Sequence, residues 1–271
     1  MLPLLLAACT SGSSESADTT ATAQPLSVAV VLDISTSWSQ VRFDGVRVGL
    51  AALLDAVVAR ETPGDRVALV AFSGRYADGL TAWAEVAGDD GAIAASWASL
   101  NVASRSGVAQ PFPEECQVST SDAFEDGGCY PAMPRSYTDE AGTDHSVGLA
   151  LALDWITESP RDGVGAVVVI TDGVANGLTE SNGQARAADG YVETRWPEYV
   201  GGVPHSTADV EADSVALASE IWSGSGYSTW VVSLSQPAEY LDEMATGVGT
   251  HVDVADAEGF GPALAGVVES Y

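Results

Sequence analysis

A carboxylate and two hydroxyls alternate along one short segment of this chain. Asp33, Ser35 and Ser37 directly follow the apolar run 26–32, which has the composition of a central strand buried on both faces. Alternate residues of an extended segment face the same side, so these three side chains can converge on one point. Hard cations such as Mg²⁺ prefer oxygen ligands of this kind. The segment therefore predicts a divalent-cation site at the end of a strand.

Two further oxygen-bearing side chains lie at the ends of other expected elements. Thr143, in Gly-Thr-Asp, precedes a helical pattern, and Asp172, in Thr-Asp-Gly, ends a second apolar run. Together with the Asp-x-Ser-x-Ser segment, these motifs resemble the metal-ion-dependent adhesion site of von Willebrand factor A domains. The segment 65–73 is similar to the second strand of that family. Each residue by itself could equally be a helix cap or a turn former.

The resemblance implies a role for each of the five residues. Ser35, Ser37 and Thr143 are expected to contact the ion directly, whereas Asp33 and Asp172 orient ligands and balance charge through water or hydrogen bonds. Mg²⁺ suits such a hydroxyl-rich set, with Mn²⁺ or Ca²⁺ as alternatives. An Asp or Glu of a protein partner would complete the coordination. The resemblance thus implies a non-enzymatic adhesion or assembly domain.

Two other functions remain open at this stage. Asp33 could be the nucleophile of a Mg²⁺-dependent phosphohydrolase, but Ser35 stands where that chemistry usually has a second carboxylate, and the chain contains no Lys. Alternatively, the chain is a structural lipoprotein with a vestigial ion site. The missing Lys also excludes Walker-type phosphate binding and Schiff-base chemistry.

The charge of the chain limits its partners. The 271 residues include 38 acidic and 10 basic residues, all ten of them Arg, which gives a formal net charge of −28. Nucleic acids and anionic lipids are bound through clustered cations, so neither is an expected partner. Nearly half of the residues are apolar, which is enough for a sizeable core.

The positioning elements alternate along the chain as strand and helix. This order predicts a doubly wound, mostly parallel, six-stranded Rossmann-like sheet with helices on both faces. Asp33 and Asp172 then end two strands that we expect to be neighbours where the strand order reverses, the usual place for a ligand. The expected strands are 26–33, 67–72, 80–86, 165–171, 229–234 and 251–254, and the expected helices are 46–57, 89–100, 143–157, 207–222, 238–246 and 261–271.

Two irregular insertions interrupt a single expected domain, 26–271. They span 103–141 and 174–206 and adjoin Thr143 and Asp172, so we expect them near the metal face, where loops select partners. The first insertion holds Cys116 and Cys129, which we expect to form a disulfide in an exported chain, with free thiols as the alternative.

The N-terminal residues resemble a bacterial lipobox. Leu6, Ala7 and Ala8 precede Cys9, although no cationic stretch and only a short apolar run come before them. The resemblance implies a signal remnant (1–9), acylation of Cys9, and a Ser/Thr/Ala-rich tether (10–25). The protein would be extracytoplasmic and would contact a membrane only through the lipid. A disordered N-terminus with an unmodified cysteine is the alternative.

The histidines show no metal-binding pattern. His145, His205 and His251 lack the spacing of a zinc site, and we expect them at the surface or at helix caps.

Overall fold

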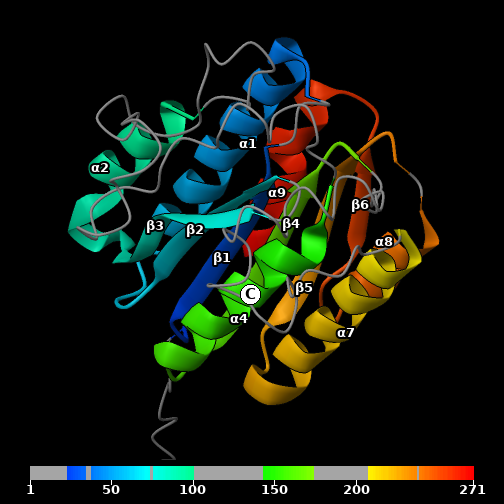
Figure 1. The fold of residues 1–271 in the computed structure, drawn as a ribbon. Coiled ribbons are helices and arrows are strands. Elements are labelled where there is room, and N and C mark those ends of the chain that lie inside the picture. The colour runs from blue at the N-terminus through cyan, green and yellow to red at the C-terminus, as the bar shows by residue number, and fades with distance from the viewer. Residues whose placement is uncertain (1–22, 35–37, 74–75, 101–142, 174–206, 237) are drawn as a thin grey trace, which may run out of the picture.

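A computed structural model describes residues 23–34, 38–73, 76–100, 143–173, 207–236 and 238–271. These residues form a three-layer α/β domain with a six-stranded sheet between two layers of helices (Figure 1). The strand order is β3-β2-β1-β4-β5-β6, and every neighbouring pair is parallel except β2 and β3. The predicted fold class is confirmed. The strands are β1 (Leu26–Asp33), β2 (Arg66–Ser73), β3 (Tyr76–Glu85), β4 (Val164–Thr171), β5 (Ser228–Leu234) and β6 (His251–Val254).

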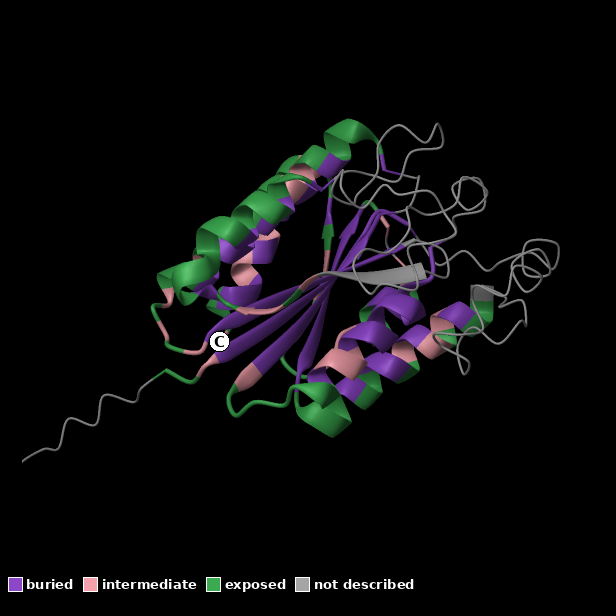
Figure 2. Ribbon diagram, turned by 60° about the vertical axis from the view of Figure 1, so that its left-hand side comes forward, coloured by how far each residue is buried: buried purple, intermediate pink, exposed green. Residues whose placement is uncertain are grey.

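The helices divide between the two faces of the sheet. One layer holds α1 (Gln40–Ala59), α2 (Val86–Ala98) and α9 (Phe260–Glu269), and the other holds α4 (His145–Glu158), α7 (Thr207–Ser225) and α8 (Glu239–Met244). Figure 2 shows buried strands between helices that are buried on their inner sides and mostly exposed outside. A short 3-10 turn, Ala257–Gly259, leads into α9.

β1 lies at the centre and divides its side chains between the two cores. Val28, Val30 and Leu32 pack towards α1 and α9, whereas Ala29 and Val31 pack towards α4 and α7. All eight residues of β1 are buried, which explains why its sequence shows no polar alternation. Strand order reverses between β1 and β4, so the two carboxyl ends meet there.

β3 differs from the expected strand. It is longer than 80–86, begins at Tyr76, and pairs antiparallel with β2. The start of β3 depends on backbone pairing with β2, since the sequence of residues 76–79 shows no alternation typical of a strand. The following helix begins at Val86 rather than Asp89 and contains a break at Gly88, where φ is +101°.

Several expectations concern residues outside the described part. Cys9, Cys116 and Cys129 lie there, as do most of the tether and the insertions 103–141 and 174–206, so their assignments stay predictions. Within the described residues, no helix combines the length and apolar character needed to cross a bilayer.

Candidate metal centre

Asp33 is fixed by the strand beside it. It is the last residue of β1 and is fully buried. β1 and β4 run in register to the Leu32–Ile170 pair, which brings Thr171 alongside Asp33. The Thr171 hydroxyl lies 2.8 Å from Asp33 Oδ2 and donates to it, a charge-assisted hydrogen bond. Thr171 was part of a predicted motif, but its role as the partner of Asp33 emerges only from the pairing of the strands.

The turn after β4 places Asp172 at the same rim. Gly173 N donates to Thr171 Oγ1 over 3.1 Å, so one threonine hydroxyl holds both Asp33 and this turn. Asp172 itself is buried. A Cβ on Gly173 would lie only 2.9 Å from Thr143 Oγ1, which shows how closely the turn approaches that hydroxyl. Asp172 and Thr143 therefore belong to adjoining segments.

Thr143 reaches this rim because α4 packs tightly against the sheet. Gly148 permits the contact, since a Cβ there would lie 2.5 Å from a methyl of Val31. Thr143 is buried and lies just outside the helix, whose N-cap is Asp144; the Asp144 carboxylate accepts from Ser146 N at 3.1 Å. Because Asp144 is the N-cap residue, Thr143 is not required as the cap of α4.

Three of the five predicted site residues thus come together at the carboxyl edge of the sheet. Asp33, Thr143 and Asp172 supply two carboxylates and one hydroxyl from three distant segments. This donor set fits a hard divalent cation. Ser35 and Ser37 lie outside the described residues, between the buried Ile34 and Trp38. Among the described residues, no three His, Cys, Asp or Glu side chains gather as a cation site of the carboxylate-rich or zinc type.

His145 is a core residue, so its expected surface or cap position is wrong. Its ring lies 5.5 Å from the ring of Phe72 and 5.9 Å from that of Tyr240. Tyr240 also places its hydroxyl 3.5 Å from His145 Nδ1. Burial lowers the pKa of His145 to about 3, so the side chain is neutral at physiological pH. A polar residue at a helix start gives no sequence signal that tertiary packing will cover it.

A second polar cluster joins β5, β6 and α8. Ser233 Oγ lies 2.8 Å from both His251 Nε2 and Asp253 Oδ1, and His251 Nδ1 lies 2.7 Å from Asp242 Oδ1. Serine, histidine and aspartate are ordered here as in a hydrolase triad. However, Ser233 is fully buried and a second carboxylate, Asp253, competes for its hydroxyl proton. The cluster instead anchors α8 and the edge strand β6 to the sheet. No sequence motif indicates this cluster, because it depends on the strand register that aligns Ser233 with Asp253.

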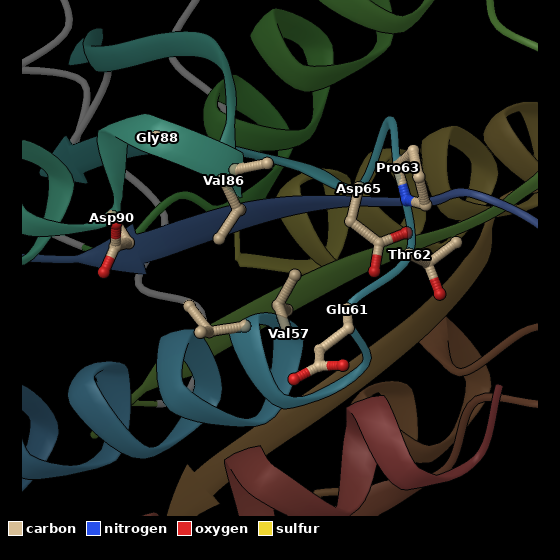
Figure 3. Close-up of a pocket in the computed structure, with 10 residues that line it drawn as sticks. Val57, Glu61, Thr62, Pro63, Asp65, Val86, Gly88 and Asp90 are labelled. Carbon is tan, nitrogen blue, oxygen red and sulfur yellow. The ribbon is translucent and has the colours of Figure 1, made fainter.

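The amino edge of the sheet contains a small hollow of about 300 Å³ (Figure 3). Val57 and Val86 form apolar walls, while Glu61, Asp65 and Asp90 supply carboxylates. The hollow lies beside the turn that precedes β2, at the end opposite to Asp33.

Solved structures with a similar fold were found. The von Willebrand factor domain of the type V pili tip protein Mfa5 from Porphyromonas gingivalis matches with a TM-score of 0.57 and 13% identity, over 92% of this chain and 96% of that chain. This chain has a von Willebrand factor A-like fold. The minor pilin PilB of Streptococcus sanguinis matches with a TM-score of 0.58 and 12% identity, over 93% and 62% of the two chains.

A third match of the VWA-like domain is the pilus adhesin SpaC of Lactobacillus rhamnosus GG, with a TM-score of 0.55 and 13% identity. It covers 91% of this chain but only 30% of SpaC, so this chain corresponds to one part of that protein. No family model and no curated protein matches the sequence. At these identities the comparisons establish the fold alone.

Proposed function

We propose that this VWA-like domain binds a protein partner through a divalent cation. Asp33, Ser35, Ser37, Thr143 and Asp172 would hold Mg²⁺, or else Mn²⁺ or Ca²⁺. When bound, the ion supplies a local positive field and an open position for a carboxylate. The observation that carries the proposal is the meeting of Asp33, Thr143 and Asp172 where the strand order reverses.

The proposed partner presents an Asp or Glu side chain to the ion. A carboxylate is otherwise repelled by a chain of net charge −28, so the cation is what makes such a contact favourable. Three of the similar structures are a pilus tip domain, a pilus adhesin and a minor pilin, which supports adhesion or assembly outside the cytoplasm. Acylation of Cys9 would hold the domain at a membrane.

Calorimetric titration tests the ion site. Mg²⁺ and Mn²⁺ should bind the full chain, and Thr143→Ala should weaken binding at least tenfold, because one direct oxygen ligand is lost. Thr157→Ala is the matched control, since Thr157 is an exposed threonine of α4, the helix that follows Thr143. Equally negligible binding in wild type and in Thr143→Ala would favour the vestigial-site alternative.

Acetate tests the open coordination position. With Mn²⁺ bound, paramagnetic relaxation of the acetate methyl protons should increase in wild type and in Thr157→Ala, but not in Thr143→Ala. No increase in wild type would contradict a carboxylate-completed ion. A screen with phosphate esters covers the enzymatic alternative, and turnover that disappears in Asp33→Asn would replace the adhesion proposal.

A further inference from the structure

A groove of about 620 Å³ lies between α7 and α8, on the same face of the sheet as α4. Ala212 and Val215 of α7 contribute small apolar surfaces, and Tyr240 contributes an aromatic one. Glu211 from α7 and Glu239 and Glu243 from α8 also line it. The groove thus combines apolar walls with three carboxylates.

Among the described residues, the charged side chains that line this groove are all carboxylates. The sequences of α7 and α8 contain seven Asp or Glu residues and no Arg. Elsewhere the fold pairs carboxylates with arginines, as in Arg60–Asp65 and Arg161–Glu85. Electrostatic complementarity therefore favours a cationic occupant.

The spacing of the glutamates within α8 points the same way. Glu239 and Glu243 are four residues apart on a helix of only six residues, an arrangement in which like charges destabilise the helix. A feature that weakens local structure without a gain inside the fold is typical of a functional surface. A cation between the two carboxylates would remove the repulsion.

One lining residue links the groove to the segment that follows Thr143. Tyr240 lines it and also contacts His145, which lies two residues after Thr143. Both α7 and α8 begin at the carboxyl edge of the sheet, as Figure 1 shows. A protein bound at the metal centre would therefore have its neighbouring residues close to this groove.

We propose that the α7–α8 groove receives an arginine or lysine side chain of the partner protein. Its aliphatic stem would lie on Ala212 and Val215, with its charge between Glu239 and Glu243. The partner would thus combine an acidic residue for the ion with a basic residue for the groove. The identity of the partner rests on the proposed function, whereas binding of a cationic segment by the groove requires no metal.

A peptide titration of the full chain in EDTA tests the groove separately from the ion site. The probe is a short peptide of alternating leucine and arginine, at low salt, followed by amide chemical shifts. We expect shifts confined to α7 and α8, and no comparable binding of the peptide with glutamate in place of arginine. Shifts elsewhere, equal binding of both peptides, or no binding at all would overturn the proposal.

Matched variants separate the groove from general attraction to an anionic surface. Glu239→Gln with Glu243→Gln should weaken peptide binding about fivefold, whereas Glu158→Gln with Glu220→Gln, which removes the same charge outside the groove, should change it less than twofold. Ala212→Trp keeps every carboxylate but fills the groove, and should abolish binding. Equal losses in the two double variants, or unaffected binding in Ala212→Trp, would contradict the groove. Peptide binding by a protein that does not bind Mg²⁺ would support the groove and contradict only the proposed ion-dependent function.

Discussion

The buried carboxylates at the two edges of the sheet make different contacts. At the amino edge, Asp65 accepts from Leu26 N at 2.7 Å and from the guanidinium of Arg60 at 3.0 Å. Arg66, next along the chain, donates to Ser27 and lies over the ring of Trp83. The Arg60 guanidinium neutralises Asp65 within the fold, and the contacts of Asp65 and Arg66 fasten the start of β1.

At the carboxyl edge, the contact made to Asp33 by Thr171 is a hydrogen bond from a neutral hydroxyl. Such a bond orients a carboxylate without neutralising it. Asp172, which directly follows the neighbouring strand β4, is buried as well. The amino-edge contacts stabilise the fold, whereas the carboxyl edge is where we propose that a cation binds.

The largest expected effect is at the amino edge. Asp65→Ala should lower the free energy of unfolding by about 3 kcal/mol, because it removes the carboxylate that pairs with the part-buried Arg60 guanidinium and accepts from the Leu26 N–H. Urea unfolding in EDTA measures the loss, with Asp55→Ala, an exposed carboxylate of α1, as control. Cation affinity should stay within twofold. A large loss of cation binding by the folded variant would contradict the proposal that the cation binds at the carboxyl edge independently of the amino edge.

Binding of the ion at the carboxyl edge should stabilise the folded protein. Mg²⁺ at one hundred times its dissociation constant should raise the free energy of unfolding of wild type by about 2.7 kcal/mol, since a ligand that binds only the folded state stabilises it. Asp172→Asn should show almost none of this gain at the same concentration. An equal increase in the free energy of unfolding of Asp172→Asn and of wild type on addition of Mg²⁺ would contradict a cation site at the carboxyl edge.

His145 should make the free energy of unfolding of this domain sensitive to acid. Its pKa is about 3 when folded and 6.5 when unfolded, so protons bind preferentially to the unfolded chain between these values. The stability associated with neutral His145 is complete above pH 6.5 and declines as pH falls. At pH 5 the loss is about 2 kcal/mol. Between pH 7 and pH 5, the free energy of unfolding of His145→Gln should depend less on pH than that of wild type. Urea titration at each pH measures it. Parallel pH profiles for the two proteins would show that His145 is not the cause.

The smallest expected effect concerns the turn beside Thr143. In Gly173→Ala the new methyl would crowd Thr143 Oγ1 at 2.9 Å, so one of the two segments must shift. We expect cation affinity to fall about threefold to tenfold, with about 1 kcal/mol of stability lost. Gly261→Ala is the control, because a Cβ there meets nothing within 4 Å. Unchanged calorimetric affinity in Gly173→Ala would place Thr143 away from the ion.

Much of the fold could be predicted because it depends on local pattern. The run 26–32 is apolar at every position except Ser27, as expected of a strand covered on both faces, and this composition separates a central strand from an edge strand. The order of strands and helices then restricts the topology to a doubly wound sheet. The start of β3 could not be predicted, since its pairing with β2 depends on a partner strand rather than on its own side chains.

The candidate site was predictable in part for the same reason. Asp33 and Asp172 each follow an apolar run, so a parallel sheet necessarily carries them to one edge. The hydrogen bond from Thr171 to Asp33 depends instead on the register between β1 and β4. The link between Ser233, His251 and Asp253 likewise depends on the pairing of β5 with β6.

The sequence by itself determined the residue types at strand ends, the alternation of elements and the excess of negative charge. Only the tertiary structure decided that Thr143 meets the Asp172 turn, that His145 is buried, and that α7 and α8 enclose an acidic groove. The physical reason is that periodicity and composition act along the chain over a few residues. Burial and contact between distant segments depend on how whole elements pack.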